Sequence, residues 1–258
     1  MRFQPSETRK RSNDLGEDWD CEAMTLLPSV SVILNVKNGA QYLEESLQSV
    51  VNQDHRPCEI LVVDNESTDE TESIARKFLS QRVRFISNHP PLGISSSRNL
   101  GIQLARGELL AFTSHDDIWV PHKLRKQAER FAARPELDYC IALVRPFLDR
   151  SISLPPAGFR PELVGAEVPG YLAETLVARP RAFERAGNFD TSFPQGEDTE
   201  WYARARDVGL KMEMIDEVLV HKRLHGNSTT YSAARAQQWR VAVLRVVKQT
   251  LERRRTLE

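Results

Sequence analysis

The sequence predicts one α/β domain with a mostly parallel central sheet flanked by helices. Between residues 29 and 144, short apolar segments rich in β-branched residues alternate with amphipathic segments. The apolar segments have the length of strands and are apolar on both faces, as strands covered on two sides are. Five such units in a row are typical of a parallel sheet wrapped by helices.

The first unit shows the pattern most plainly. Residues 29–36, SVSVILNV, predict a strand, and the helix that follows has Leu43, Leu47, Val50 and Val51 at helical spacing. Further strands are expected at 59–64, 82–87, 108–113 and 139–144, and further helices at 67–79, 95–107 and 121–134.

After residue 145 the alternation stops. Residues 146–170 are rich in proline and glycine and predict an irregular segment over the edge of the sheet. A strand and short helix (175–190), a helix (196–209), strand-like alternation (211–225) and a long amphipathic helix (233–255) are expected next. We therefore divide the chain into a mobile N-terminal arm (1–28), an α/β domain (29–230) and a C-terminal amphipathic basic helix (231–258).

Composition excludes several classes of protein. Acidic residues (36) balance basic ones (35), so no nucleic-acid partner is expected. Three widely spaced cysteines indicate a reducing compartment, and no apolar run reaches the ~20 residues of a membrane helix, so a cytoplasmic protein is expected. The first strand is followed neither by a P-loop nor by a G-x-G-x-x-G motif, which argues against P-loop enzymes and ordinary dinucleotide binders.

Polar residues follow three of the predicted strands. They are Asn35 to Asn38, Asp64 to Ser67, and Ser114 to Asp117. Ligands of open parallel sheets bind outside the carboxyl ends of the strands, so these residues are expected to share one site.

Two adjacent carboxylates, Asp116 and Asp117, interrupt the apolar stretch around residues 109–119. One interpretation is an ordinary loop in which Asp117 caps the helix near Pro121. The other is a site for a divalent cation that bridges phosphate oxygens, since carboxylates suit Mg²⁺ or Mn²⁺.

Asp64 has two interpretations as well. It is either the cap of the next helix or a ligand contact beside Asn65. Ser67 and Glu70 have the spacing of a capping box, which leaves Asp64 and Asn65 to face a base or a ribose.

Two residues nearer the C-terminus are further candidates. Asp198 lies at the start of a predicted helix, where acids are common, but a carboxylate opposite a diphosphate also suits a general base. His225 is either a structural histidine or a ligand of metal or phosphate.

Four segments, residues 29–53, 59–71, 95–124 and 187–209, together resemble the family 2 glycosyltransferases of the GT-A fold. The resemblance implies a Rossmann-like nucleotide-diphospho-sugar transferase fold, in which the sugar moves to an acceptor with inversion. It also implies a role for each matching residue.

By this resemblance, Asp117 holds the metal, His225 lies near the diphosphate and belongs to the metal site with it, and Asp198 is the catalytic base. The expected nucleotide contacts are Asn35, Val36, Lys37, Asp64, Asn65, Arg98 and Asp116. Ser114, Asn65 and Lys37 depart from the usual residues, and the last two affect recognition of the base.

The expected function is metal-assisted, inverting transfer of a sugar from a nucleotide-diphosphate donor to a hydroxyl acceptor, with Mn²⁺ or Mg²⁺. The acceptor would be a glycan, a lipid-linked molecule or a cell-surface polysaccharide precursor. The alternatives are a metal-dependent phosphohydrolase and a non-catalytic nucleotide-sugar-binding protein. The stripe of Trp239, Val243, Val246 and Val247 on the C-terminal helix indicates docking on the domain, a homodimer, or peripheral contact with the inner face of the membrane.

Overall fold

A computed structural model describes residues 27–88, 93–193, 195–226 and 233–255, with side chains of the last segment described from 241 to 253. The predicted N-terminal arm therefore lies outside the described residues, apart from Leu27 and Pro28. The strands are β1 (Val30–Val36), β2 (Glu59–Asp64), β3 (Val83–Ser87), β4 (Leu109–Ser114), β5 (Ile118–Trp119), β6 (Tyr139–Leu148), β7 (Val168–Pro169), β8 (Val177–Ala178) and β9 (Met212–Leu224). The helices are α1 (Leu43–Val51), α2 (Thr71–Arg76), α3 (Ile94–Leu104), α4 (Lys123–Ala133), α5 (Pro180–Ala186), α6 (Glu197–Asp207) and α7 (Ala233–Arg255), with short 3₁₀ turns η1 (Leu79–Gln81), η2 (Pro161–Leu163) and η3 (Ala173–Thr175).

The described strands form one sheet in the order β3-β2-β1-β4-β8-β6-β9-β5, and β7 pairs with β6. The pairs β1–β2, β1–β4, β2–β3 and β6–β9 are parallel, which confirms the predicted mostly parallel sheet. The short strand β8 is antiparallel to both β4 and β6 and joins the two parallel parts.

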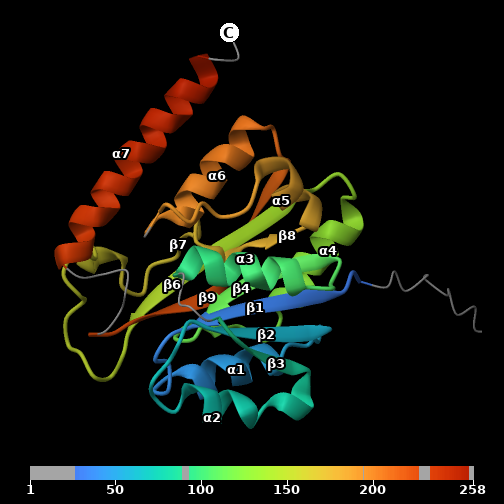
Figure 1. The fold of residues 1–258 in the computed structure, drawn as a ribbon, viewed down its shortest axis with the longest axis vertical. Coiled ribbons are helices and arrows are strands. Elements are labelled where there is room, and N and C mark those ends of the chain that lie inside the picture. The colour runs from blue at the N-terminus through green and yellow to red at the C-terminus, as the bar shows by residue number, and fades with distance from the viewer. Residues whose placement is uncertain (1–26, 89–92, 194, 227–232, 256–258) are drawn as a thin grey trace, which may run out of the picture.

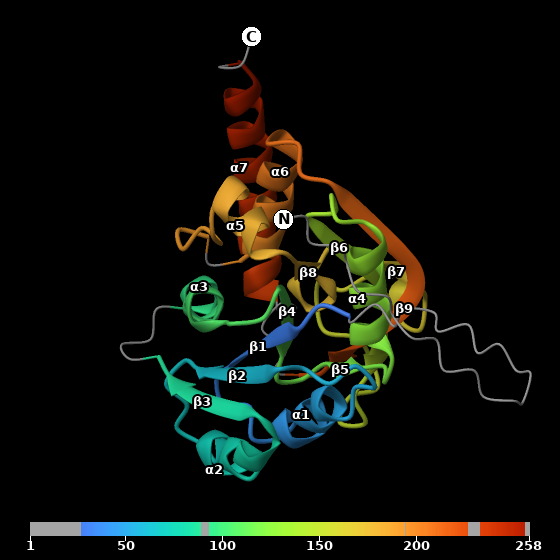
Figure 2. The same cartoon turned by 90° about the vertical axis from the view of Figure 1, so that its right-hand side faces the viewer.

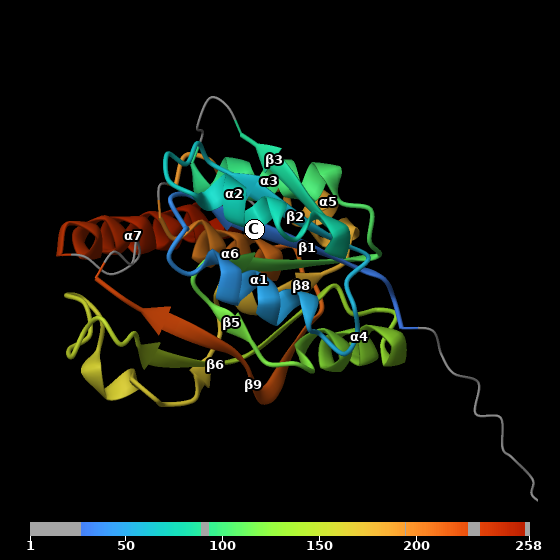
Figure 3. The same cartoon turned by 90° about the horizontal axis from the view of Figure 1, so that it is seen from below.

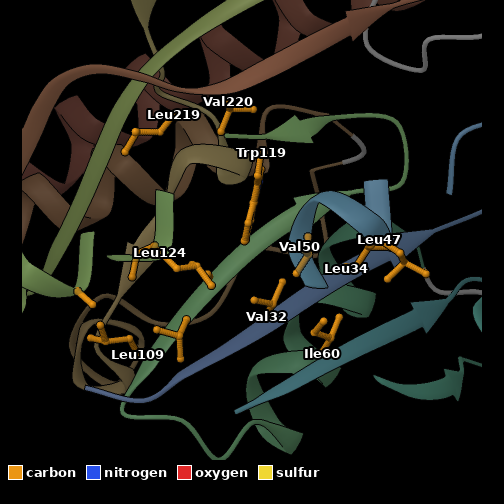
Figure 4. Close-up of a cluster of buried hydrophobic side chains, with 14 of the residues drawn as sticks. Val32, Leu34, Leu47, Val50, Ile60, Leu109, Trp119, Leu124, Leu219 and Val220 are labelled. Carbon is orange, nitrogen blue, oxygen red and sulfur yellow. The ribbon is translucent and has the colours of Figure 1, made fainter. Parts of the chain in front are cut away.

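Helices cover both faces of the sheet (Figures 1 and 2). Alternate residues of β1 point to opposite faces. Val32 and Leu34 pack with α1, α2 and α4, whereas Ile33 packs with α3, α5 and α6. Figure 4 shows the first of these cores, where Leu47 and Val50 of α1 lie over β1. Each fully buried aliphatic side chain stabilises the fold by about 1.5–3 kcal/mol, so this core holds the strand ends in place.

The carboxyl ends of β1 and β4 lie side by side although β2 and β3 separate them in the chain. The chain leaves β1 in one direction, reaches the edge at β3, and returns to the other side of β1. This is a topological switch point, where a crevice for ligands is expected in sheets of this kind.

Strand β9 is a single strand of 13 residues, where the sequence pattern predicts alternating strand segments. Its pairing with β6 shifts register between Ala142 and Val144, and β5 pairs antiparallel with its far end at His221. Bulges bend a strand and increase its twist. The end of β9 therefore reaches the residues that follow β4, and Figure 3 shows β5, β6 and β9 together along one side of the molecule.

The predicted capping box at Ser67 and Glu70 is wrong. Helix α2 begins at Thr71, and Asp69 Oδ1 accepts the Thr71 backbone N–H at 3.1 Å. Ser67 instead donates both its N–H and its hydroxyl to Asp64. Likewise, Pro121 is not the first residue of the next helix, because α4 begins at Lys123.

Helix α7 packs against α6 (Figure 1), and its buried side differs from the predicted stripe. Ala242 and Val246 are buried, whereas Val247 is half exposed. The side chain of Trp239 lies outside the described residues. Arg253 Nε donates to Asp207 Oδ2 of α6 at 3.0 Å. Within the described ranges, none of the helices combines the length and apolarity that crossing a bilayer requires.

Candidate active site

The register of β1 with its two neighbours assembles the predicted site. Asn35 pairs with Ser114 of β4, and Val36 pairs with Asp64 of β2. Lys37 follows directly and is exposed. Residues that are up to 79 positions apart in the chain therefore meet at one edge of the sheet.

One side of this edge presents amide and carboxylate groups that are held by short-range contacts. Asp64 is bonded to Ser67, and Asn65 Oδ1 accepts from Asn88 Nδ2 at 3.3 Å and from the Gly93 backbone N–H at 3.4 Å. Asn35 Oδ1 is buried and has no hydrogen-bond partner in the part of the chain that the structure describes. Because buried polar atoms nearly always have a partner, this orphan acceptor suits an N–H or O–H group of a ligand.

Next to it, Asp116 faces His225. Asp116 Oδ2 lies 3.1 Å from His225 Nε2, and its other oxygen accepts from the Ser114 hydroxyl. Burial opposes ionisation of Asp116, but the hydrogen bond from His225 and the charges of His115 and Lys222 bring its pKa below the ordinary value. Asp116 is therefore a carboxylate at neutral pH.

Asp117 is placed differently. It is fully buried, Lys222 Nζ donates to its Oδ2 at 3.1 Å, and the Arg223 backbone N–H donates to its Oδ1 at 3.0 Å. Burial raises the pKa of Asp117, while Lys222 acts in the opposite direction. Both oxygens of the predicted metal ligand are thus occupied by groups of β9.

The residues present therefore fit a divalent cation best at Asp116 and His225. The two side chains lie 3.1 Å apart, and imidazole and carboxylate are both ligands that a transition-metal ion such as Mn²⁺ would accept. No group of three or more potential ligands among His, Cys, Asp and Glu occurs in the described ranges. A cation here would take its other ligands from diphosphate oxygens and water, as Mg²⁺ usually does.

Arg223, which no sequence motif marks as functional, anchors this region. Its Nε donates to the Asp116 carbonyl oxygen at 3.0 Å, and its Nη1 donates to Asp149 at 2.9 Å. The guanidinium lies between the rings of Tyr42 and Phe147, with centroids at 4.8 and 4.9 Å. In the sequence, a role for Arg223 in the site is indicated only by its position two residues before His225. Arg223 orders the backbone that carries the carboxylates.

Arg98 is buried beside the start of α6. The guanidinium is only 2% exposed; it donates from Nη1 to Glu197 and from Nη2 to Glu174 at 3.2 Å. The nearby carboxylates raise the pKa of Arg98 further, although burial alone would lower it. Arg98 therefore contacts the start of α6, and its predicted contact with a nucleotide stays a prediction.

Asp198 is the second residue of α6 and is partly exposed. Its Oδ1 accepts the Thr199 backbone N–H at 2.7 Å. Burial, and then the charge of the adjacent Glu197, raise the pKa of Asp198 to about 7. A carboxylate that exchanges its proton near neutral pH has the acid strength that a general base needs.

Comparison with known proteins identifies the family of the chain. Residues 31–164 match the family model described as glycosyl transferase family 2. An uncharacterized glycosyltransferase of Rickettsia typhi is 29% identical over 220 residues, which cover 81% of this chain and 68% of that protein. An Escherichia coli protein, UDP-Glc:alpha-D-GlcNAc-diphosphoundecaprenol beta-1,3-glucosyltransferase WfgD, is 33% identical over 98 residues, 38% of this chain and 39% of that one.

A solved structure shares the fold. The mannosyltransferase PcManGT from Pyrobaculum calidifontis, in complex with GDP-Man and Mn²⁺, superposes with a TM-score of 0.63 at 20% identity. The match covers 79% of this chain and 59% of that one. The predicted GT-A fold is thereby confirmed. With a family model that spans more than half of its residues, the chain belongs to glycosyl transferase family 2.

Proposed function

We propose that the protein transfers a sugar, with inversion, from a nucleotide-diphosphate donor to a hydroxyl acceptor, assisted by a divalent cation. The observation that carries this proposal is a sheet edge with ligand-binding groups, which ion pairs connect to the first turn of α6. The edge carries the orphan acceptor Asn35 and the Asp116 carboxylate 3.1 Å from His225, and α6 carries Asp198 with a pKa of about 7.

The nucleotide would lie over the ends of β1 and β2. Asp64, Asn65 and Asn35 offer acceptors to the base and ribose, and Val36 lines the edge between them. Lys37 is exposed and carries a positive charge toward the diphosphate. The PcManGT complex contains a nucleotide sugar on the same fold, which supports a donor of this class.

Asp116 and His225 are the residues that would hold the cation. Mn²⁺ or Mg²⁺ supplies charge neutralisation of the departing diphosphate when bound there. Asp117, which the sequence predicts as the ligand, holds Lys222 and the end of β9 in this arrangement. Mn²⁺ in the PcManGT structure supports metal use by proteins of this fold.

Asp198 is proposed as the general base. In an inverting transfer the acceptor oxygen attacks the anomeric carbon as the bond to the diphosphate breaks, and its proton must leave. The Asp198 carboxylate accepts that proton, which fits both its partial exposure and its pKa. Hydrogen bonding by Thr199 orients the carboxylate.

The proposed acceptor is a glycan, a lipid-linked molecule or a polysaccharide precursor. The WfgD name specifies a sugar on a diphosphoundecaprenol acceptor, which supports a lipid-linked acceptor for this chain. The outer side of α7 carries exposed apolar residues, which suit contact with the inner face of a membrane or a second subunit. They are Val241, Leu244, Val247 and Leu251.

The test is donor turnover by the purified full chain. UDP- and GDP-sugars are incubated singly with Mn²⁺, Mg²⁺ or EDTA, and release of nucleotide diphosphate is measured with and without a lipid-diphosphate acceptor. We expect one donor class to react, with loss of turnover in EDTA. Release of inorganic phosphate from simple phosphate esters, with intact nucleotide sugars, would instead identify a phosphohydrolase. Binding of a nucleotide sugar without turnover would identify a non-catalytic protein.

A further inference from the structure

A buried glutamate lies between the two halves of the candidate active site. Glu174, in the turn η3, is 6% exposed, and its Oε1 accepts from Arg98 Nη2 at 3.2 Å. Its Oε2 lies 4.0 Å from Lys222 Nζ. One carboxylate thus faces two buried cations from different elements, and no motif in the sequence marks it.

Each of the two cations also pairs with a second carboxylate, and these carboxylates lie on opposite sides of the site. Lys222 bonds Asp117, which is adjacent in the chain to Asp116 on the donor side. Arg98 bonds Glu197, which is adjacent to the proposed base. The ion pairs therefore connect Asp117, Lys222, Glu174, Arg98 and Glu197 in one line.

Burial makes this connection sensitive to the charge at position 174. A buried cation that loses a partner keeps its desolvation penalty without the compensating attraction. Glutamine at 174 could still accept from Arg98, but its amide N–H groups would then face the ammonium of Lys222. The change leaves the size of the side chain intact and removes only the attraction that joins β9 to α3 and α6.

We propose that Glu174 is a positioning residue that holds the donor-side carboxylates and the base on α6 in one geometry; this inference rests on the proposed function. Glu174 contacts neither reacting group. It acts through Lys222 on the loop after β4 and through Arg98 on the first turn of α6. Misplacement of reacting groups by about 1 Å can reduce rates by about 10²-fold.

The test compares Glu174→Gln with a matched control, Glu200→Gln. Glu200 is also a buried glutamate with an arginine partner, Arg204, and lies two residues from Asp198 on the same helix. We expect Glu174→Gln to lower donor turnover by roughly 10- to 100-fold while nucleotide affinity with Mn²⁺ changes less than about threefold. Glu174→Asp, which keeps the charge, should restore part of the turnover, and Glu200→Gln should retain most of it.

Amide hydrogen exchange gives a second measurement that does not depend on turnover. In Glu174→Gln we expect faster exchange both in residues 197–201 of α6 and in residues 220–224 of β9, whereas Glu200→Gln should leave residues 220–224 unchanged. Three outcomes would overturn the proposal. Exchange at the end of β9 could be unchanged in Glu174→Gln, the two glutamine variants could lose turnover equally, or Glu174→Gln could lose nucleotide affinity as much as turnover. If the wild-type protein turned over no donor, the proposed function would fail, and the exchange pattern would still decide whether Glu174 joins the two elements.

Discussion

Among single residues, Asp198 has the most direct consequence for chemistry. Replacing it with asparagine removes the proton acceptor and leaves the nucleotide contacts of β1 and β2 untouched. We therefore expect Asp198→Asn to reduce turnover by about 10²–10⁴-fold with unchanged nucleotide affinity.

Because the base must be ionised and its pKa is raised to about 7, wild-type turnover should fall as the pH drops below about 7. Initial rates between about pH 5.5 and 8.5 measure this, and unchanged rates in the variant would reduce Asp198 to a structural role.

The neighbouring aspartates allow the metal site to be assigned by a pair of variants. If the cation binds at Asp116 and His225, Asp116→Asn should weaken Mn²⁺-dependent nucleotide binding by about tenfold or more. Asp117→Asn should mainly lower stability, because Lys222 would lose the nearer of its two buried carboxylates. Titration calorimetry of nucleotide diphosphate with and without Mn²⁺ distinguishes the two. If Asp117→Asn folded stably but lost Mn²⁺-dependent nucleotide binding, the result would support Asp117 as the metal ligand, as the sequence predicts.

At the scale of elements, α7 shows how an amphipathic helix can have two apolar sides with different roles. Val246 packs with Ala242 and with Phe193 of the loop before α6, whereas Leu244 is 70% exposed. Arg253 adds an ion pair to Asp207 at the far end of the contact. The inner side is thus bound to the domain, and the outer side is the part that a membrane or second subunit could contact.

Val246→Asp should therefore destabilise the docking of α7, because it buries an unpaired carboxylate. We expect a loss of about 2 kcal/mol or more in the free energy of unfolding, since single changes of this kind are among the most destabilising. Leu244→Asp, the matched control, should stay within about 0.5 kcal/mol. Urea denaturation measures both, and equal stability of the two variants would mean that α7 does not depend on this contact.

For the whole molecule, stability should respond to pH through Lys123, a lysine buried in the core. Its ammonium donates to Gln127 Oε1 at 2.7 Å and lies 3.9 Å from the centroid of the Trp119 ring. Burial lowers the pKa of Lys123 to about 7. Between about pH 7 and the pKa of an unfolded lysine near 10.4, the unfolded chain binds a proton that the folded chain does not. Stability from this residue therefore rises with pH, by up to about 1.4 kcal/mol per pH unit.

Lys123→Met should remove that rise. The cleanest window is about pH 7 to 8.5, because the raised pKa of Cys140, about 12, makes stability change at higher pH as the unfolded thiol ionises. Lys126→Met is the matched control, since Lys126 lies on the same helix and its side chain is 37% exposed. Urea midpoints at several pH values measure the slope. The same slope in wild type and Lys123→Met would show that Lys123 is charged in the folded protein.

Sequence periodicity by itself determined the alternating strands and helices, the parallel sheet, and the common edge at which Asn35, Asp64 and Ser114 meet. It did so because parallel strands place their carboxyl ends together whatever the loops between them do. The family was also predictable from the sequence alone, because four separate segments resemble it in the right order along the chain.

Only the tertiary structure decided which charged groups pair. Lys222 is 105 residues from Asp117, and Arg98 is 76 residues from Glu174, so no local pattern could relate them. Tertiary structure also decided which residue caps α2. The Ser67 hydroxyl donates to Asp64, and Asp69 accepts the Thr71 backbone N–H at the start of the helix. A sequence states which side chains can form ion pairs and hydrogen bonds. The partner that each one takes depends on which elements the buried core brings together, since a buried charge needs a nearby partner to offset its loss of water.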